Sequence, residues 1–226
     1  MAIALVSASK NTAATAGASV SISPAANTSA GNLLIVCWFA NGTSLGFPTV
    51  TGSAGGTWSS SVIFTPDSNH TEAIYSLSNA AVYTTTDTVT VAVSGASEID
   101  VHFLEYSGAD TTDARDGSGL SNWYNGVPST TGDPGSFTPT TANDLILGFS
   151  AQPNVNTAGV TPASGYTKEL NNLVVGFECD TEDQVVSGTP TVDASWTYSV
   201  SAAWFCVEAA FKPPAAADTL LGQAVL

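Results

Sequence analysis

Residues 33–40 read LLIVCWFA, an unbroken run of eight apolar side chains that ends at the turn signal Asn41-Gly42. A short apolar run bounded by turn residues is typical of a strand buried on both faces, because helices usually need at least about 10–12 residues. Three other stretches have the same character: VHFLEY (101–106), LILGFSA (145–151) and AAWFCVEAAF (202–211). These four segments predict the central strands of a β-sheet core.

The rest of the chain continues this pattern. Alternating segments such as TVTVAV (88–93) are separated by Gly, Pro, Asn and Ser, as in sandwiches and barrels, and no segment has a sustained 3.6-residue period. Charged residues make up 10% of the chain, against about 25% in ordinary globular proteins. We therefore expect an all-β protein, a two-sheet antiparallel β-sandwich of the jelly-roll kind. It would form one domain over residues 1–212, followed by a docking tail over 213–226.

The two halves of the chain repeat short phrases in the same order. SAGNLLI (29–35) resembles TANDLIL (141–147), and residues 88–105 align without gaps on 191–208, so that Glu105 and Glu208 fall together. Thr71-Glu72 likewise resembles Thr181-Glu182. These echoes predict a duplicated half-sandwich, with the two copies interleaved as Greek keys. The alternative is chance similarity between alternating segments built from the same common residues.

The phrases TSAGNLLIV (28–36), EIDVHFLEYSGADT (98–111) and TTANDLILGF (140–149), followed by TEDQVV (181–186) and a last apolar strand, are similar to a known group. They resemble roughly 200-residue β-sandwich domains of bacterial surface proteins and phage virion proteins. The resemblance extends over nearly the whole chain up to Lys212. It implies a jelly-roll sandwich displayed on a surface, and it carries over no functional residues.

The charge balance excludes several classes of partner. The chain has 4 Lys and Arg residues against 19 Asp and Glu, a formal net charge of −15 at pH 7. Nucleic-acid binding relies on basic side chains that neutralise phosphates, and the same acidic field repels anionic lipid surfaces. No apolar stretch approaches the roughly 18–20 residues of a membrane helix. The opening MAIALVSASK lacks the pattern of a signal peptide.

Two sets of side chains suggest catalysis, and in both a structural role is the simpler interpretation. Alternation places Asp100, His102 and Tyr106 on one strand face, but no G-x-S-x-G nucleophile accompanies them. Glu105 and Glu208 could form the carboxylate pair of a glycosidase, but matching positions in two repeats more simply indicate a repeated structural role. We expect no enzymatic activity.

A calcium site is the one metal centre that the sequence suggests. Asp110, Asp113 and Asp116 follow one another at a spacing of three residues, and a loop could add the backbone oxygens that Ca²⁺ needs. A solvated loop neutralised by Arg115 is the alternative. A second acidic patch is a comparable candidate of the same kind and comprises Glu178, Asp180, Glu182 and Asp183.

The three cysteines leave the redox state open. Cys37 and Cys206 lie in apolar runs and Cys179 makes the number odd. Buried free cysteines behave as small apolar residues. A bridge between Cys37 and Cys206 is the alternative, because connectivity cannot be deduced from sequence.

Aromatic residues beside Gly-, Ser- and Asn-rich loops are the main ligand-binding candidates. Trp58 follows GGT, and Trp123 and Tyr124 lie in SNWYNG. Sugar-binding proteins stack pyranose rings on such side chains, since Trp combines a large apolar face with a polar N–H. The alternative is that the three rings pack under long loops.

The tail after Pro213-Pro214 contains four large aliphatic side chains: Leu220, Leu221, Val225 and Leu226. A segment this short cannot bury them by itself, so we expect it to dock on a neighbouring subunit. Together these features predict a structural or interaction protein, a subunit that decorates or builds a virion, fibre or other surface assembly. The alternative is a carbohydrate-binding module, with or without Ca²⁺, and either protein would act on a virion or at an extracellular surface.

Overall fold

The protein is seen in a computed structural model that describes residues 2–13, 19–117, 120–123, 128–153, 159–174 and 176–215. Within these ranges the chain forms strands and no helix, which confirms the all-β prediction. The strands are β1 (Ala4–Ala13), β2 (Ser19–Ile22), β3 (Leu33–Gly42), β4 (Thr49–Gly52), β5 (Ser59–Phe64), β6 (His70–Leu77), β7 (Val89–Ala92), β8 (Ala96–Ser107), β9 (Leu120–Trp123), β10 (Ser129–Gly132), β11 (Leu145–Pro153), β12 (Val160–Thr161), β13 (Thr167–Val174), β14 (Phe177–Val185), β15 (Trp196–Ala202) and β16 (Phe205–Phe211).

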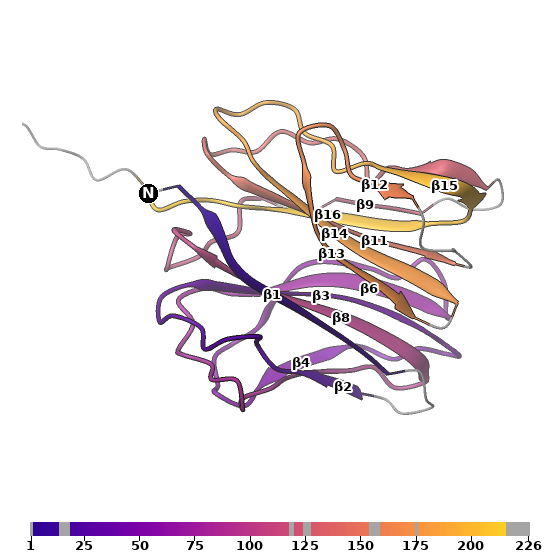
Figure 1. Ribbon diagram of the computed structural model, residues 1–226, viewed down its shortest axis with the longest axis horizontal. Helices are drawn as coiled ribbons and strands as arrows, with labels where there is room; N and C mark the ends of the chain where they lie inside the picture. Colours follow the sequence, from indigo (N-terminus) through magenta and orange to yellow (C-terminus); the bar gives the residue numbers. More distant parts are fainter. Residues whose placement is uncertain are drawn as a thin grey trace, which may run out of the picture.

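These strands form four antiparallel sheets stacked in layers (Figure 1). The two inner sheets have five strands each, in the orders β1-β8-β3-β6-β5 and β13-β14-β11-β16-β9. A three-stranded sheet covers the outer side of each, β2-β7-β4 on the first and β10-β15-β12 on the second. The β-sandwich prediction is confirmed, but the sandwich has four layers instead of two.

The duplication is visible in the strand order. Adding eight to each strand number of the first half turns β1-β8-β3-β6-β5 into β9-β16-β11-β14-β13, and β2-β7-β4 into β10-β15-β12, which are the sheets of the second half. Each half passes back and forth between its two sheets as a jelly roll does, except that its fifth strand pairs with the sixth at the sheet edge. The halves are therefore two jelly rolls in tandem, and the expected interleaving is wrong because no sheet formed by the described residues mixes strands from both halves.

Strand register defines which residues of the two halves are true counterparts. Leu33 and Leu145 open β3 and β11, so Val36 corresponds to Gly148. Glu208 pairs with Gly148, whereas Glu105 pairs with Leu34, two residues earlier along β3. The sequence alignment of these two glutamates is therefore wrong by two residues. The sequence pattern does not reveal this error, because a shift of two residues keeps every side chain on the same face and leaves the alternation unchanged.

The second similarity, between Thr71-Glu72 and Thr181-Glu182, does not correspond to equivalent positions in the structure either. Glu72 pairs with Phe39, whose ring lies in the core between the five-stranded sheets. Glu182 pairs with Gly148, which points the other way, toward the outer sheet of the second half. Thr71-Glu72 and Thr181-Glu182 thus occupy opposite faces of their sheets.

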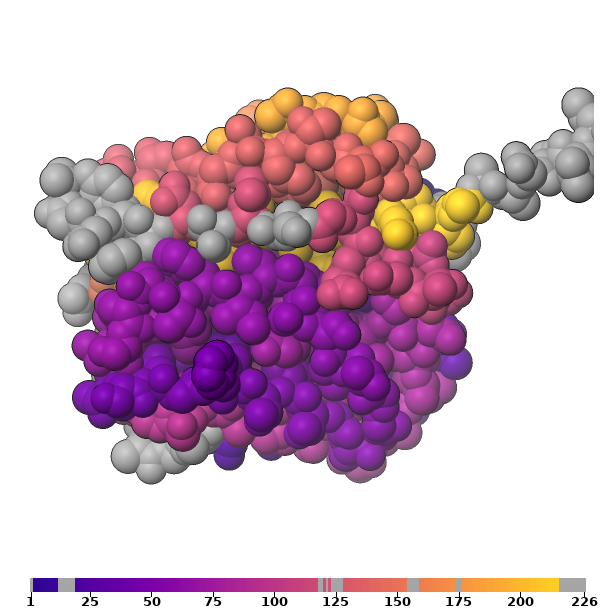
Figure 2. All heavy atoms as spheres, turned by 180° about the vertical axis from the view of Figure 1, so that it is seen from behind, coloured from indigo at the N-terminus to yellow at the C-terminus, as the bar shows by residue number. Residues whose placement is uncertain are grey.

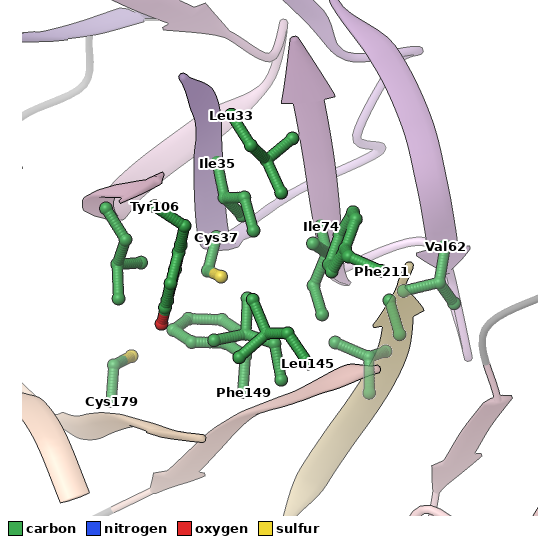
Figure 3. Packing of buried hydrophobic residues seen from close by; sticks show 14 of the residues in the cluster. Leu33, Ile35, Cys37, Val62, Ile74, Tyr106, Leu145, Phe149, Cys179 and Phe211 are labelled. Atoms are coloured by element: carbon green, nitrogen blue, oxygen red, sulfur yellow. The ribbon is translucent and has the colours of Figure 1, made fainter. Parts of the chain in front are cut away.

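Three layers of apolar side chains hold the sheets together. Ile35 and Cys37 point from β3 into the core shared by the two halves, where Figure 3 shows them opposite Phe149 of β11. The intervening Val36 and Trp38 point the other way, into the core under β2-β7-β4. Residues 33–40 are apolar without interruption because both faces of β3 are covered, and each large side chain buried there contributes about 1.5–3 kcal/mol.

Polar contacts also join the halves along β1 and β8. The Tyr106 hydroxyl donates to Asp183 Oδ2 at 2.7 Å, His102 Nδ1 lies 2.5 Å from Thr181 Oγ1, and Lys10 Nζ donates to the Asn171 carbonyl. Figure 2, seen from the opposite side, shows the two halves packed against each other as one body. The predicted single domain over residues 1–212 corresponds to these two jelly rolls with their shared core.

Candidate functional site

Of the three aromatic residues predicted to bind a ligand, the structure describes the side chain of Trp58. Trp58 is only 9% exposed and packs in the core of the first half, so neither face of its indole is free for a sugar. Trp123 ends β9 beside Phe205 of β16, but its side chain lies outside the described residues, and so does Tyr124. The proposal for these two residues stays a prediction, and the one for Trp58 is wrong because the loop folds inward.

The three aspartates of the proposed calcium loop have separate partners. Asp110 accepts a hydrogen bond from Thr112 N at 2.7 Å, and Asp113 pairs with Arg115. Asp116 accepts from the backbone N–H groups of Thr140 and Thr141. No group of three His, Cys, Asp or Glu side chains in the described ranges is placed to hold a metal ion. The loop is thus stabilised by local hydrogen bonds.

His102 and Asp100 form a buried pair without access to solvent. Nε2 of the histidine lies 3.4 Å from Oδ1 of the aspartate, and both side chains are at most 1% exposed. Burial lowers the pKa of His102 to about 3 and raises the pKa of Asp100 to about 8, so both groups are uncharged at neutral pH. The arrangement is a neutral buried pair, hydrogen-bonded across the junction through His102 Nδ1 and Thr181 Oγ1, and it lacks the exposure that a catalytic base needs.

The cysteines are free thiols. Cys37 and Cys179 lie in the core shared by the two halves (Figure 3), while Cys206 lies under the outer sheet of the second half. A bridge between Cys37 and Cys206 is therefore not formed, because the two side chains lie in different apolar layers.

A polar groove of about 440 Å³ opens where the connection between the halves folds back on the first jelly roll. Its walls carry Ser and Thr hydroxyls and the Asn79 amide, and its rim carries Asp113 and Arg115. Arg115 Nε lies 3.1 Å from Asp113 Oδ1, and this ion pair lowers the pKa of the aspartate. The groove therefore presents one positive and one negative charge at neutral pH, with no net charge between them.

This groove is preformed. The Ala114 N–H donates to Ser78 Oγ at 3.0 Å, which ties the connection to the end of β6. Arg115 Nη1 donates to the Ser60 carbonyl on β5 at 3.2 Å. Because the walls are held by the protein itself, a ligand would not need to order them, which favours binding. Sequence reasoning missed this site, since its residues come from three separate stretches without a common pattern.

An apolar patch lies on the first half, between the loop that joins β3 to β4 and the end of β5. We call this surface the Phe47 patch; it consists of Leu45, Gly46, Phe47, Pro48, Ile63 and Thr65 and surrounds a hollow of about 560 Å³. Phe47 is 97% exposed and Ile63 is 43% exposed. Leaving a phenylalanine in water forgoes about 1.5–3 kcal/mol of burial free energy, so a patch of this kind indicates an interaction surface.

The Phe47 patch and the last described residues are at opposite ends of β3. Leu33 at the start of β3 pairs with Tyr106, close to the segment whose Asp110 N–H donates to the Lys212 carbonyl. The loop of Phe47 follows the other end of β3, which at ~3.3 Å per residue is roughly 30 Å away. Leu220, Leu221, Val225 and Leu226 lie outside the described residues, so their docking stays a prediction.

Comparison with family models, with curated proteins and with solved structures found no match to this chain. No helix in the described part of the chain is long and apolar enough to cross a membrane. The fold therefore defines the class: an all-β sandwich protein of two tandem jelly rolls, whose described surface includes the Phe47 patch and the neutral polar groove.

Proposed function

We propose that the protein is a non-catalytic structural subunit that associates with further copies of itself to decorate or build a surface assembly, such as a virion or a fibre. The observation that carries this proposal is the exposed Phe47 patch. Both faces of each five-stranded sheet are already covered, one by an outer sheet and the other by the other half. Phe47, at 97%, is the most exposed of the large hydrophobic side chains in the described part of the chain.

The partner in this proposal is a second copy of the chain. The four aliphatic residues of the tail supply an apolar segment that follows the opposite end of the molecule. A contact between the tail of one copy and the Phe47 patch of the next is heterologous, and such contacts produce rings or filaments. The formal charge of −15 disfavours close packing of other faces.

Replacing Phe47 by serine is expected to abolish self-association without loss of folding. The ring is almost fully exposed, so its removal should change the free energy of unfolding by less than about 0.5 kcal/mol. Sedimentation velocity and electron microscopy over a range of concentrations provide the measurement. Val200→Ser, which alters a side chain that is 47% exposed in the second half, is the matched control and should assemble normally.

A second variant lacking residues 213–226 tests the other side of the same contact and should also remain monomeric. The proposal fails if the wild-type protein is a monomer at all concentrations tested. It also fails if Phe47→Ser associates as well as Val200→Ser does.

A carbohydrate-binding module is the second candidate function, and the polar groove favours it. A neutral sugar presents hydroxyl groups that both donate and accept, and the groove offers hydroxyls, an amide and a fixed ion pair that complement them. The absence of net charge in the groove favours neutral over anionic saccharides.

Asp113→Ala is expected to weaken sugar binding about tenfold, because it removes a charged hydrogen-bond acceptor. The measurement is an NMR titration with maltotriose, cellotriose and mannotriose, with trigalacturonic acid as the anionic comparison. Asp87→Ala, which alters another surface aspartate that accepts from Ser53, is the control. Absence of any shift at the groove with all three neutral sugars would refute this candidate.

A further inference from the structure

The strand register reveals a difference between the halves that the fold does not require. Glu182 of β14 and Glu208 of β16 both pair with Gly148, one on either side. The counterpart of Gly148 is Val36, which pairs with Tyr75 and Phe103. The same positions hold two carboxyl groups in the second half and two aromatic rings in the first.

Both carboxyl groups lie inside the protein. Glu182 and Glu208 are 0% exposed, between the second five-stranded sheet and the outer sheet that covers it. Burying a carboxylate without a cation costs free energy that an aromatic side chain would not. Since Tyr75 and Phe103 fill the corresponding layer of the first half, the jelly roll does not need acids at these positions.

Each carboxyl group holds one connection of the outer layer in place. Glu182 Oε2 accepts from Ala163 N at 2.8 Å, in the connection between β12 and β13. Glu208 Oε2 accepts from Ala194 N at 2.9 Å, in the connection between β14 and β15. The second oxygen of each carboxyl group, Oε1, is buried and has no hydrogen-bond partner among the described residues.

Gly148 lets the second connection close directly over the two acids. A Cβ atom at this glycine would lie 2.7 Å from the Cβ of Ala194 and 3.3 Å from Glu182 Oε1. Any side chain here would push the connection outward. The first half has Val36 at the corresponding position, buried in its own core.

The surroundings of the acid pair, Glu182 and Glu208, are themselves mainly acidic. Lys168 of β13 pairs with Glu182 in the sheet, but its Nζ lies 3.3 Å from Asp180 Oδ1 and donates to the Val160 carbonyl. The other titratable groups that interact with the pair from neighbouring elements are Asp180 of β14, Asp193 beside Ala194, Asp133 after β10, Tyr166 before β13 and Cys206 of β16.

We propose that Glu182 and Glu208 form a proton-dependent closure of the second jelly roll: protonated, they hold residues 162–166 and 191–195 against the sheet, and on losing their protons they release these connections. The first jelly roll, with aromatic residues in place of the acids, stays closed. Rising pH therefore releases these two connections and leaves the corresponding connections of the first half in place.

The direction follows from the burial of the pair. Burial raises the pKa of both groups to about 8, and the charge of Glu208 adds to the effect on Glu182. In the open form both side chains reach water and regain ordinary pKa values near ~4.3. The closed form therefore binds more protons between these limits, and closure is lost as pH rises through about 8.

Hydrogen exchange of the Ala163 and Ala194 amides from pH 6 to pH 9 tests the proposal. After correction for intrinsic exchange, their opening constant should rise roughly tenfold per pH unit up to pH 8 for each carboxyl group that must lose its proton. Ser53 and Tyr83, whose amides are hydrogen-bonded in the corresponding connections of the first half, are internal controls and should not follow this profile.

Glu182→Gln with Glu208→Gln should remove the pH dependence, since an amide keeps the shape and the acceptor oxygen but cannot ionise. Glu105→Gln is the matched control: this buried glutamate of the first half accepts from Ser29 N, and its replacement should leave the profile of the second half unchanged. The proposal is overturned if the opening constants of Ala163 and Ala194 are independent of pH in the wild type. It is equally overturned if the double glutamine variant retains the wild-type profile.

Discussion

Raising the pH from 5 to 8.5 is expected to lower the free energy of unfolding of the whole protein by at least about 4 kcal/mol. The reason is a set of buried acids beyond the acid pair. Burial raises the pKa of Asp100 to about 8 and that of Asp180 to about 7. It also raises the pKa of Asp144 to about 8, with help from the neighbouring charge of Asp116.

The sign follows from proton uptake. Each of these acids has a higher pKa in the folded protein than the ordinary ~3.9 of an unfolded aspartate. The folded state therefore binds more protons between pH 4 and pH 8, and stability falls as pH rises through this window. One such group changes the free energy of unfolding by about 1.4 kcal/mol per pH unit. Two groups that contribute this amount over the whole window would therefore lower the free energy of unfolding by more than about 4 kcal/mol.

Urea unfolding at half-unit intervals from pH 5 to pH 8.5 measures this dependence. The series starts at pH 5 so that other acids do not contribute to it. The ion pair with Arg115 lowers the pKa of Asp113, and hydrogen bonds lower the pKa of Asp116. The stability that these two groups provide is therefore lost only in stronger acid. Asp144→Asn should reduce the slope, while Glu98→Gln, at a half-exposed glutamate, should not. A stability that is constant or rises toward pH 8.5 would contradict the prediction.

The central strands could be predicted from sequence because their composition depends on burial alone. Residues 33–40 and 145–151 are apolar on both faces since each strand has a covered face on either side. The number of layers could not be predicted in the same way. A strand buried between two sheets has the same pattern whether the neighbouring sheet comes from its own half or from the other half.

The candidate sites were harder to predict because burial of polar residues depends on the third and fourth layers. Glu182 belongs to TEDQVV, which reads as an exposed strand, yet the outer sheet covers it completely. Trp58 follows three small or polar loop residues and reads as exposed, yet the loop turns it into the core. Neither outcome follows from alternation, since both depend on which face a distant segment covers.

Phe149→Ala is expected to lower the free energy of unfolding by about 3–5 kcal/mol, a large share of the stability of a typical domain. The ring is 0% exposed at the centre of the core shared by the two halves, and it meets the ring of His102 edge-on at 5.4 Å. Its removal leaves a cavity bordered by residues of both jelly rolls. Phe47→Ala makes the same chemical change on the surface and should cost less than about 0.5 kcal/mol.

The distribution of this loss decides whether the two jelly rolls fold as one unit. If they share one cooperative transition, Phe149→Ala in the second half must lower hydrogen-exchange protection in β3 and β6 of the first half as much as in β14 and β16. The contacts of His102 with Thr181 and of Tyr106 with Asp183 favour this outcome, because they span the same junction. Unchanged protection in β3 and β6 would show that the halves unfold independently, and residues 1–212 would then comprise two domains.

A shared transition would mean that the core between the five-stranded sheets stabilises both halves. Neither five-stranded sheet can lose contact with the other without exposing its apolar inner face to water.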